Sequence, residues 1–149
     1  MKNSEKYKTA ESNIDRRLAD MKYGSGRTEC LALGIYRGFQ YAVYNIRGSH
    51  PCGYVNISGH ENELIGDPEA TYDFEHFYWL DCHGGVTYAE SCLGNFAGGY
   101  WIGWDYAHLG DYNWYRDDIG VKHNTGEVVC ACKNVIDQIC DRLEVACGK

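Results

Sequence analysis

Apolar residues recur at helical spacing near both ends of the chain. Near the C-terminus they form a continuous face across residues 127–146, made of Val128, Cys132, Val135, Ile136, Ile139 and Leu143. Near the N-terminus the stripe is thin, made of Tyr7, Ile14, Leu18 and Met21 among charged residues. The pattern therefore predicts a C-terminal amphipathic helix over 127–146 and an N-terminal helix over 4–22. The second helix either docks, possibly on another subunit, or remains a solvated arm.

Between these helices the pattern changes to short β-prone runs bounded by Gly, Pro and polar residues. Residues 28–36 and 39–46 are expected to pair across a turn at Gly38. Further strands are expected at 52–57, 72–80, 86–88 and 100–106. A polar, turn-rich stretch over 59–70 is expected to be a surface loop that could serve as a lid. Residues 89–99 and 112–126 are expected to be irregular connections.

A run of strands closed by a helix predicts the α+β class. We expect an antiparallel β-sheet, a meander spanning residues 28–111, with the N-terminal and C-terminal helices packed on it. No composition shift or internal repeat divides the chain, so residues 1–149 are expected to form a single domain.

Composition narrows the possible partners and the compartment. A net charge of −7 disfavours long nucleic acid, whose binding depends on neutralising phosphates. The polar N-terminus has no signal-peptide pattern, and no apolar run is long enough to span a membrane. Eight Cys without any CxxC pair then indicate reduced thiols in a cytoplasmic protein.

The first candidate site segment is 81–88, where His83 precedes Gly84 and Gly85. Neutral imidazole can exchange protons near neutral pH, and two glycines allow a close backbone approach to a ligand. We favour a ligand-binding role for His83, Gly84 and Gly85, with Thr87 and Tyr88 beside them. The alternative is a hydrogen-bonded His that only locks the turn.

The second candidate segment is 101–111, which ends in Asp105, His108 and Asp111. Their spacing suits a turn that gathers three side chains. With His83 they could bind a metal, form Asp–His pairs, or simply cap backbone amides. We favour a metal-free polar site, so no metal and no cofactor is expected.

Three arginines are candidates for contacts to an anion, namely Arg37, Arg47 and Arg116. Arg37 and Arg47 flank a Tyr-rich hairpin, which would combine stacking surfaces with phosphate contacts. Surface arginines on strand edges are the plainer interpretation. Trp104 and Trp114 are expected in a pocket wall, whereas Trp101 is expected in the core.

Three motifs in this order resemble a family of short proteins encoded by tailed phages. They are Cys52-Gly53-Tyr54-Val55, His83-Gly84-Gly85-Val86-Thr87-Tyr88, and Trp101-Ile102-Gly103-Trp104-Asp105-Tyr106-Ala107-His108-Leu109-Gly110-Asp111. Tyr115-Arg116-Asp117 matches a further element, so the resemblance covers about the C-terminal two thirds. Family members often carry Phe and Cys where this chain has Trp104 and Tyr106, which argues against a family-wide thiol nucleophile at 106.

A phage origin implies a counter-defence role in the host cytoplasm, an analogy of context rather than of fold. Our first hypothesis is a non-catalytic, homo-oligomeric protein that sequesters a nucleotide-derived immune signal, such as a cyclic ADP-ribose-like molecule or a cyclic dinucleotide. The second is a phosphodiesterase-type hydrolase using His83 and His108 as acid and base, with Asp105 beside them. The third is a protein–protein inhibitor of a host defence enzyme.

Overall fold

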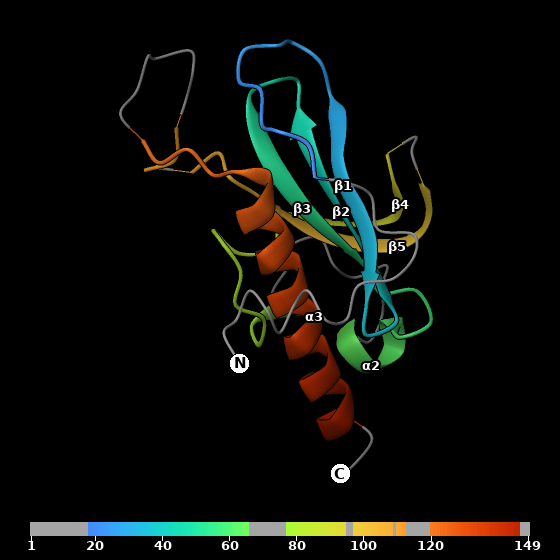
Figure 1. Ribbon diagram of the computed structural model, residues 1–149. Helices are drawn as coiled ribbons and strands as arrows, with labels where there is room; N and C mark the ends of the chain where they lie inside the picture. Colours follow the sequence, from blue (N-terminus) through green and yellow to red (C-terminus); the bar gives the residue numbers. More distant parts are fainter. Residues whose placement is uncertain (1–17, 66–76, 95–96, 109, 113–119, 147–149) are drawn as a thin grey trace.

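The fold is an antiparallel sheet covered on one face by a long helix, as the sequence predicts. The computed structural model describes residues 18–65, 77–94, 97–108, 110–112 and 120–146. Its strands are β1 (Glu29–Tyr36), β2 (Phe39–Ile46), β3 (His50–Asn56), β4 (Tyr88–Leu93) and β5 (Ala97–Asp105). Its described helices are α2 (Glu61–Ile65) and α3 (Thr125–Ala146). Figure 1 shows α3 running obliquely across the sheet, and the α+β class is confirmed.

The strand order is β1-β2-β3-β5-β4. The first three strands form the expected meander, joined by tight turns in which Arg37 and Arg47 adopt φ of 51° and 53°. Each is followed by a glycine with positive φ, the backbone combination that hairpin turns favour. β5 then pairs with β3, and β4 occupies the edge. Strand β5 is therefore paired on both sides, by β3 and by β4. This pairing fixes the position of its end and of the segment around Asp105.

The two faces of the sheet bury different residues, because side chains alternate along a strand. Toward α3, the core contains Val43, Val55, Ile102 and Trp104 together with α3 residues such as Ile136. The opposite face buries a smaller cluster made of Ala42, Tyr44, Cys52, Tyr54, Leu93 and Trp101. Trp101 is completely buried, so its expected place in the core is confirmed.

Two glycines let aromatic rings lie directly against the paired strands β3 and β5. Gly53 is opposite Trp104, and Gly103 is opposite Tyr54. A Cβ atom at Gly53 would lie 2.5 Å from the Trp104 ring, and one at Gly103 would lie 2.8 Å from the Gly53 carbonyl oxygen. The small residues thus set how closely the core packs on both faces.

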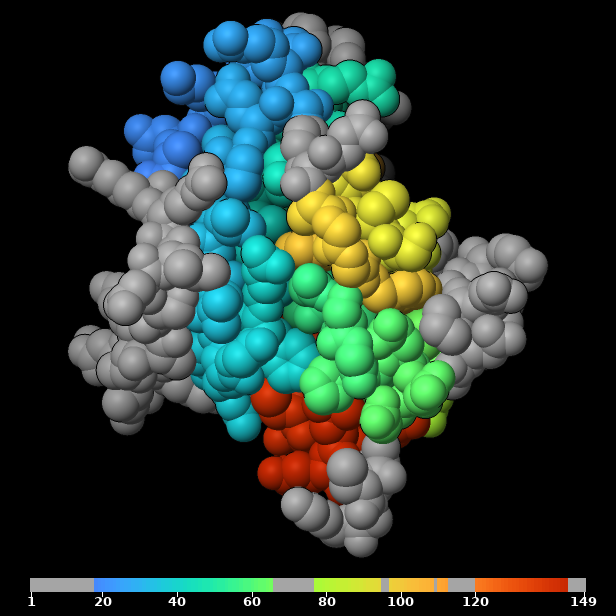
Figure 2. Space-filling model, turned by 90° about the vertical axis from the view of Figure 1, so that its right-hand side faces the viewer, coloured from blue at the N-terminus to red at the C-terminus, as the bar shows by residue number. Residues whose placement is uncertain are grey.

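Helix α3 begins two residues before the predicted start, because Asn124 caps it. The Asn124 side chain accepts a hydrogen bond from the Glu127 amide at 2.8 Å and donates to the Glu127 carboxylate at 2.7 Å. Short helix α2 buries Leu64 and Ile65, and Figure 2 shows it (green) beside the C-terminal part of α3 (red). Among the described residues, no helix combines the length and apolar character needed to cross a membrane.

The N-terminal helix prediction is wrong where it can be compared. Residues 4–17 lie outside the described residues, and 18–22 are not helical. This segment instead hydrogen-bonds to the sheet, because the Ala19 amide donates to the Leu31 carbonyl and Asn45 donates to the Lys22 carbonyl. These sheet contacts replace the local bonds of a helix.

Three further predictions from the pattern need correction. Residues 61–65 of the expected 59–70 loop form α2, because Leu64 and Ile65 pack into the core. Residues 77–80 form a turn instead of a strand, with Phe77 and Leu80 buried; residues 72–76 lie outside the described range. The expected 89–99 connection contains most of β4 and the start of β5, because it forms a hairpin at the sheet edge.

We predict that Gly103→Ala lowers the free energy of unfolding by about 1–3 kcal/mol, the usual cost of overpacking a core. The added methyl group would clash with the Gly53 backbone, which lacks a rotamer to move away. Gly98→Ala is the matched control on the same strand, because nothing lies within 4 Å of its added Cβ. Denaturant unfolding of both variants checks this, and equal effects would contradict it.

Candidate functional site

The candidate site is a group of three imidazoles and two carboxylates, here called the histidine cluster: His83, His108, His123, Asp105 and Asp111. Asp111 lies at its centre, with only 5% of its side chain exposed. His83 Nε2 lies 2.8 Å from Asp111 Oδ2, and His123 Nε2 lies 3.1 Å from Oδ1. The His108 backbone amide also donates to Oδ2 at 3.0 Å. Three segments far apart in sequence thus converge on one carboxylate.

The protonation pattern follows from this geometry. An ionised carboxylate only accepts hydrogen bonds, so His83 and His123 donate to Asp111 through Nε2–H. Burial by itself raises the pKa of Asp111, but the His108 amide and the bonds from His83 and His123 outweigh burial. The pKa of Asp111 is therefore below its ordinary value, and the carboxylate is ionised at neutral pH.

Tyr106 packs against two imidazoles of the histidine cluster. Its ring stacks on His83 with centroids 4.5 Å apart and contacts His123 at 4.6 Å. The Trp104 indole donates to the Tyr106 hydroxyl at 3.1 Å. Both aromatic residues are buried, so the imidazoles rest on the core and their positions depend on β5.

Asp105 and His108 form a second Asp–His pair beside the first. His108 Nε2 lies 3.2 Å from Asp105 Oδ1, and Asp105 Oδ2 accepts from the Thr87 hydroxyl at 2.9 Å. The Ala107 amide also donates to Asp105, as in the Asx-type turn that was the alternative interpretation of this segment. The ring centroids of His83 and His108 are 5.8 Å apart. Two imidazoles, each with its own carboxylate, therefore share one small region.

Gly84 and Gly85 form a turn with positive φ values of 69° and 82°. The His108 ring occupies the space that a Cβ at Gly84 would need, so only glycine fits there. The Gly85 amide donates to the Cys82 carbonyl at 3.0 Å. Gly84 therefore brings His83 and His108 together, and the Gly85 amide is engaged within the turn instead of facing an anion.

His123 was not among the residues selected from the sequence. It lies just before α3, where its Nδ1 atom is 3.5 Å from Glu127 Oε2. The Tyr23 hydroxyl hydrogen-bonds to the His123 carbonyl, and an isolated bridge joins Asp111 to Val121. The only local signal is a His placed shortly before a helix-capping sequence, Asn124 to Glu127.

Other predicted site residues lie elsewhere. Arg37 forms an ion pair with Asp137 of α3 at 2.8 Å. Arg47 lies at the opposite end of β2, and an eight-residue strand spans roughly 25 Å. Arg37 and Arg47 therefore cannot converge on one small ligand.

Two other predicted contacts also point away from the histidine cluster. Tyr88 packs against Tyr54 on the opposite face of the sheet. Trp104 was predicted in a pocket wall, but it lies in the core with 1% of its surface exposed. Its indole donates a hydrogen bond to the Tyr106 hydroxyl. Arg116 and Trp114 lie outside the described residues.

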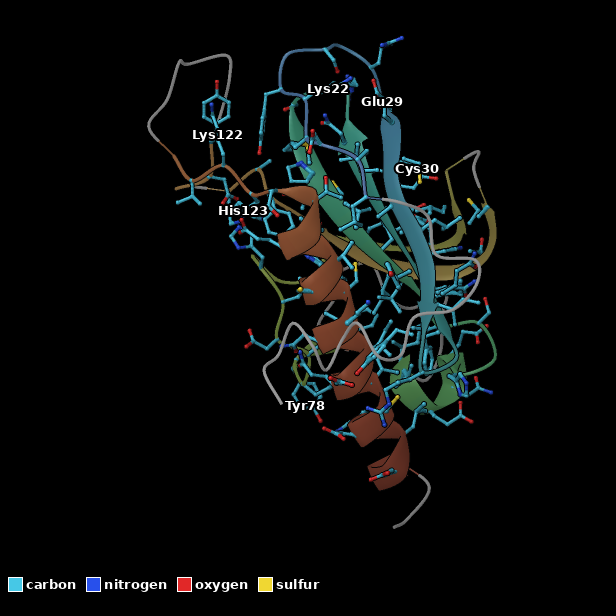
Figure 3. The ribbon with its side chains drawn as sticks, viewed as in Figure 1. Lys22, Glu29, Cys30, Tyr78, Lys122 and His123 are labelled. Carbon is cyan, nitrogen blue, oxygen red and sulfur yellow. The ribbon has the colours of Figure 1, made fainter. Side chains whose placement is uncertain are left out.

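An aromatic residue and a lysine, Tyr112 and Lys122, are adjacent in sequence to two members of the histidine cluster. Lys122 Nζ lies 4.5 Å from the centroid of the Tyr112 ring, which also makes an edge contact with Tyr23. Tyr112 follows Asp111 and Lys122 precedes His123. Figure 3 shows Lys122 and His123 together near the N-terminal end of α3, away from Tyr78.

A separate pocket of about 260 Å³ lies between the first hairpin and the end of β3. Its lining is formed by Gly38, Phe39, Gln40, Asn56, Ser58 and His60. It contains one imidazole and no carboxylate, so it offers less chemistry than the histidine cluster.

Comparisons with protein-family models, with curated proteins and with solved structures find no match to this chain. The functional assignment therefore depends on the chemistry of the site itself.

We predict that Asp111→Asn lowers the free energy of unfolding at pH 7 by about 1–3 kcal/mol, because a buried donor would face imidazole donors. The depressed pKa sets the pH dependence. The stabilisation by Asp111 is present above the ordinary pKa of 3.8 and is lost as pH falls through the lower folded value. The difference between wild type and variant should therefore shrink in acid.

Denaturant unfolding at several pH values measures this difference. Asp141→Asn is the control, because it makes the same chemical change at an exposed position of α3. A pH-independent difference for Asp111→Asn, or an equal loss in the control, would contradict the central role of this carboxylate.

Proposed function

We propose that the histidine cluster binds a small nucleotide-type phosphate molecule, and that the protein sequesters this molecule as a phage counter-defence protein in the host cytoplasm. The observation that carries the proposal is the gathering of three imidazoles, with the Tyr112–Lys122 pair formed by the residues adjacent in sequence to Asp111 and His123. The side chains of His83 and His108 are 34% and 37% exposed, and within the His108 ring the Nε2 atom is buried.

Each part of such a ligand has a matching group. The Tyr112 ring offers a stacking surface for a base, and Lys122 offers a positive charge for a phosphate. The ring nitrogen of His83 that does not face Asp111 can hydrogen-bond to a ribose hydroxyl, whereas the Thr87 hydroxyl already donates to Asp105. Lys122 thus takes the role first expected for Arg37 and Arg47.

The ligand class is part of the proposal: a cyclic ADP-ribose-like molecule or a cyclic dinucleotide, as expected if the sequence motifs reflect a phage origin. Homo-oligomer formation belongs to the same proposal.

A second candidate is a hydrolase that cleaves the same ligand class. It is favoured by the 5.8 Å separation of the His83 and His108 rings, since both imidazoles can then reach one phosphorus atom. Asp111 and Asp105 would each orient one imidazole. One imidazole would take the proton from the attacking water, and the other would protonate the leaving oxygen.

We predict that at least one member of a panel of cyclic dinucleotides and ADP-ribose isomers raises the melting temperature. A ligand at 100 times its Kd stabilises the folded state by about 2.7 kcal/mol. His108→Ala should abolish the shift, because it removes an imidazole of the histidine cluster. His60→Ala is the matched control, because His60 packs against Phe39 in the separate pocket.

Heat denaturation of the same samples, followed by chromatography, separates the two candidates. Intact ligand supports sequestration, and cleaved ligand supports the hydrolase. A shift lost in His60→Ala and kept in His108→Ala would move the site to the separate pocket. The absence of any shift or cleavage would overturn both nucleotide proposals.

A further inference from the structure

We propose that His83, Asp111 and His123 bind one divalent first-row transition-metal ion. Each residue offers one donor atom, and these atoms all lie within 4.8 Å of one another. Two imidazoles and one carboxylate are the ligand set of many catalytic and oxygen-binding metal centres, where they leave other coordination positions open. This inference concerns the metal itself and does not require a nucleotide ligand.

The spacing of the donor atoms fits one ion. Two ligand atoms about 2.1 Å from a metal and at right angles lie about 3 Å apart. His83 Nε2 lies 2.8 and 3.0 Å from the two Asp111 oxygens, and His123 Nε2 lies 3.1 Å from Oδ1. Small side-chain shifts would therefore exchange the two N–H···O bonds for metal–ligand bonds.

The groups around the donors also fit a metal centre. Metal-binding His residues usually direct their second nitrogen at a carboxylate or carbonyl, which fixes the tautomer. Glu127 lies in this position, 3.5 Å from Nδ1 of His123. The His108 amide donates to the Asp111 carboxylate, and the Tyr106 ring stacks on His83 and makes a tilted contact with His123. The three donors are therefore held before any ion arrives.

The charge of the surrounding residues and the chemical softness of the donor atoms indicate which metal ions suit the site. Asp105, Asp111 and Glu127 make the surroundings negative, which favours a cation. Nitrogen donors favour zinc, manganese, iron(II) or cobalt over calcium and magnesium. The donor atoms that lie close together are those of His83, Asp111 and His123, and the adjacent Cys82 is not among them.

Metal binding would also complete the proposed ligand site. The two carboxylates of the histidine cluster and the neighbouring Glu127 outnumber the one nearby Lys122, which is a poor balance for a phosphate. An ion with open positions beside the half-exposed His83 would bind phosphate oxygens directly. This last step alone rests on the proposed function.

The test is titration of the chelator-stripped full chain with Mn²⁺ and, separately, with Co²⁺. Mn²⁺ is followed by calorimetry and electron paramagnetic resonance, and it discriminates against the chain's many thiols because it prefers oxygen and nitrogen ligands. Co²⁺ is followed by visible absorption, where thiolate charge-transfer bands would reveal cysteine ligands. We expect one ion per chain with no thiolate band, and release of protons on binding.

Variants then assign the ligands. His123→Ala is expected to weaken metal binding by at least about 100-fold. Glu127→Gln should weaken it by about 10–100-fold, the usual effect of losing the group that orients a metal-binding His. Because Gln keeps an acceptor for the Asn124 cap and the side chain is 53% exposed, this variant should fold normally. His60→Ala should bind like wild type.

The outcomes separate this inference from the proposed function. No binding by wild type, or undiminished binding by both His123→Ala and Glu127→Gln, would overturn the metal site. Metal binding without any nucleotide shift would keep the metal site and overturn the ligand proposal. Equal nucleotide binding with and without chelator would keep the ligand proposal and remove the metal as its phosphate contact.

Discussion

The region around the histidine cluster depends on one electrostatic requirement, which is that the buried carboxylate of Asp111 must have donors. A buried, ionised carboxylate without partners is far more costly than any single contact nearby. His83, His123 and the His108 amide meet this requirement. They come from three separate segments, so folding of the loop before β4, the turn after β5 and the start of α3 is coupled through one side chain.

The donors of Asp111 are positioned by two aromatic residues at the end of β5. Trp104 lies against Gly53 of the neighbouring strand, and Tyr106 lies between Trp104 and the imidazoles. The close β3–β5 packing therefore reaches the site through Trp104, its hydrogen bond to Tyr106, and the stacking of Tyr106 on His83. A site built on such a strand end is more precisely positioned than one built on loops alone.

The sequence predicts the helices and strands whose apolar residues recur at regular spacing, and it misses the elements that lack such a pattern. Helix α3 has a continuous apolar face, and β1 to β3 are β-prone runs divided by glycines, so these elements were predicted closely. Strand β4 is largely exposed at the sheet edge, and its residues carry little apolar alternation. The segment after Leu18 follows the sheet through backbone hydrogen bonds, which leave no trace in the side-chain pattern.

The same limit applies to the site. His83, Asp105, His108 and Asp111 stood out because each lies beside a glycine or strand end, and the structure brings them together. His123 is 40 residues from His83, and its contact depends on tertiary packing that no local spacing encodes. Arg37 was predicted to contact a ligand, but it has a structural role. Its ion pair with Asp137 joins the first hairpin to α3.

The net negative charge around the histidine cluster opposes the binding of a phosphate ligand. Carboxylates outnumber the nearby Lys122, so repulsion would offset much of what imidazole hydrogen bonds contribute to anion binding. The Nε2 protons of His83 and His123 point at Asp111, so they do not face an anion. A divalent ion replaces those protons with two positive charges at the same point. The donor geometry and the ligand proposal therefore favour the same species, a metal held by His83, Asp111 and His123.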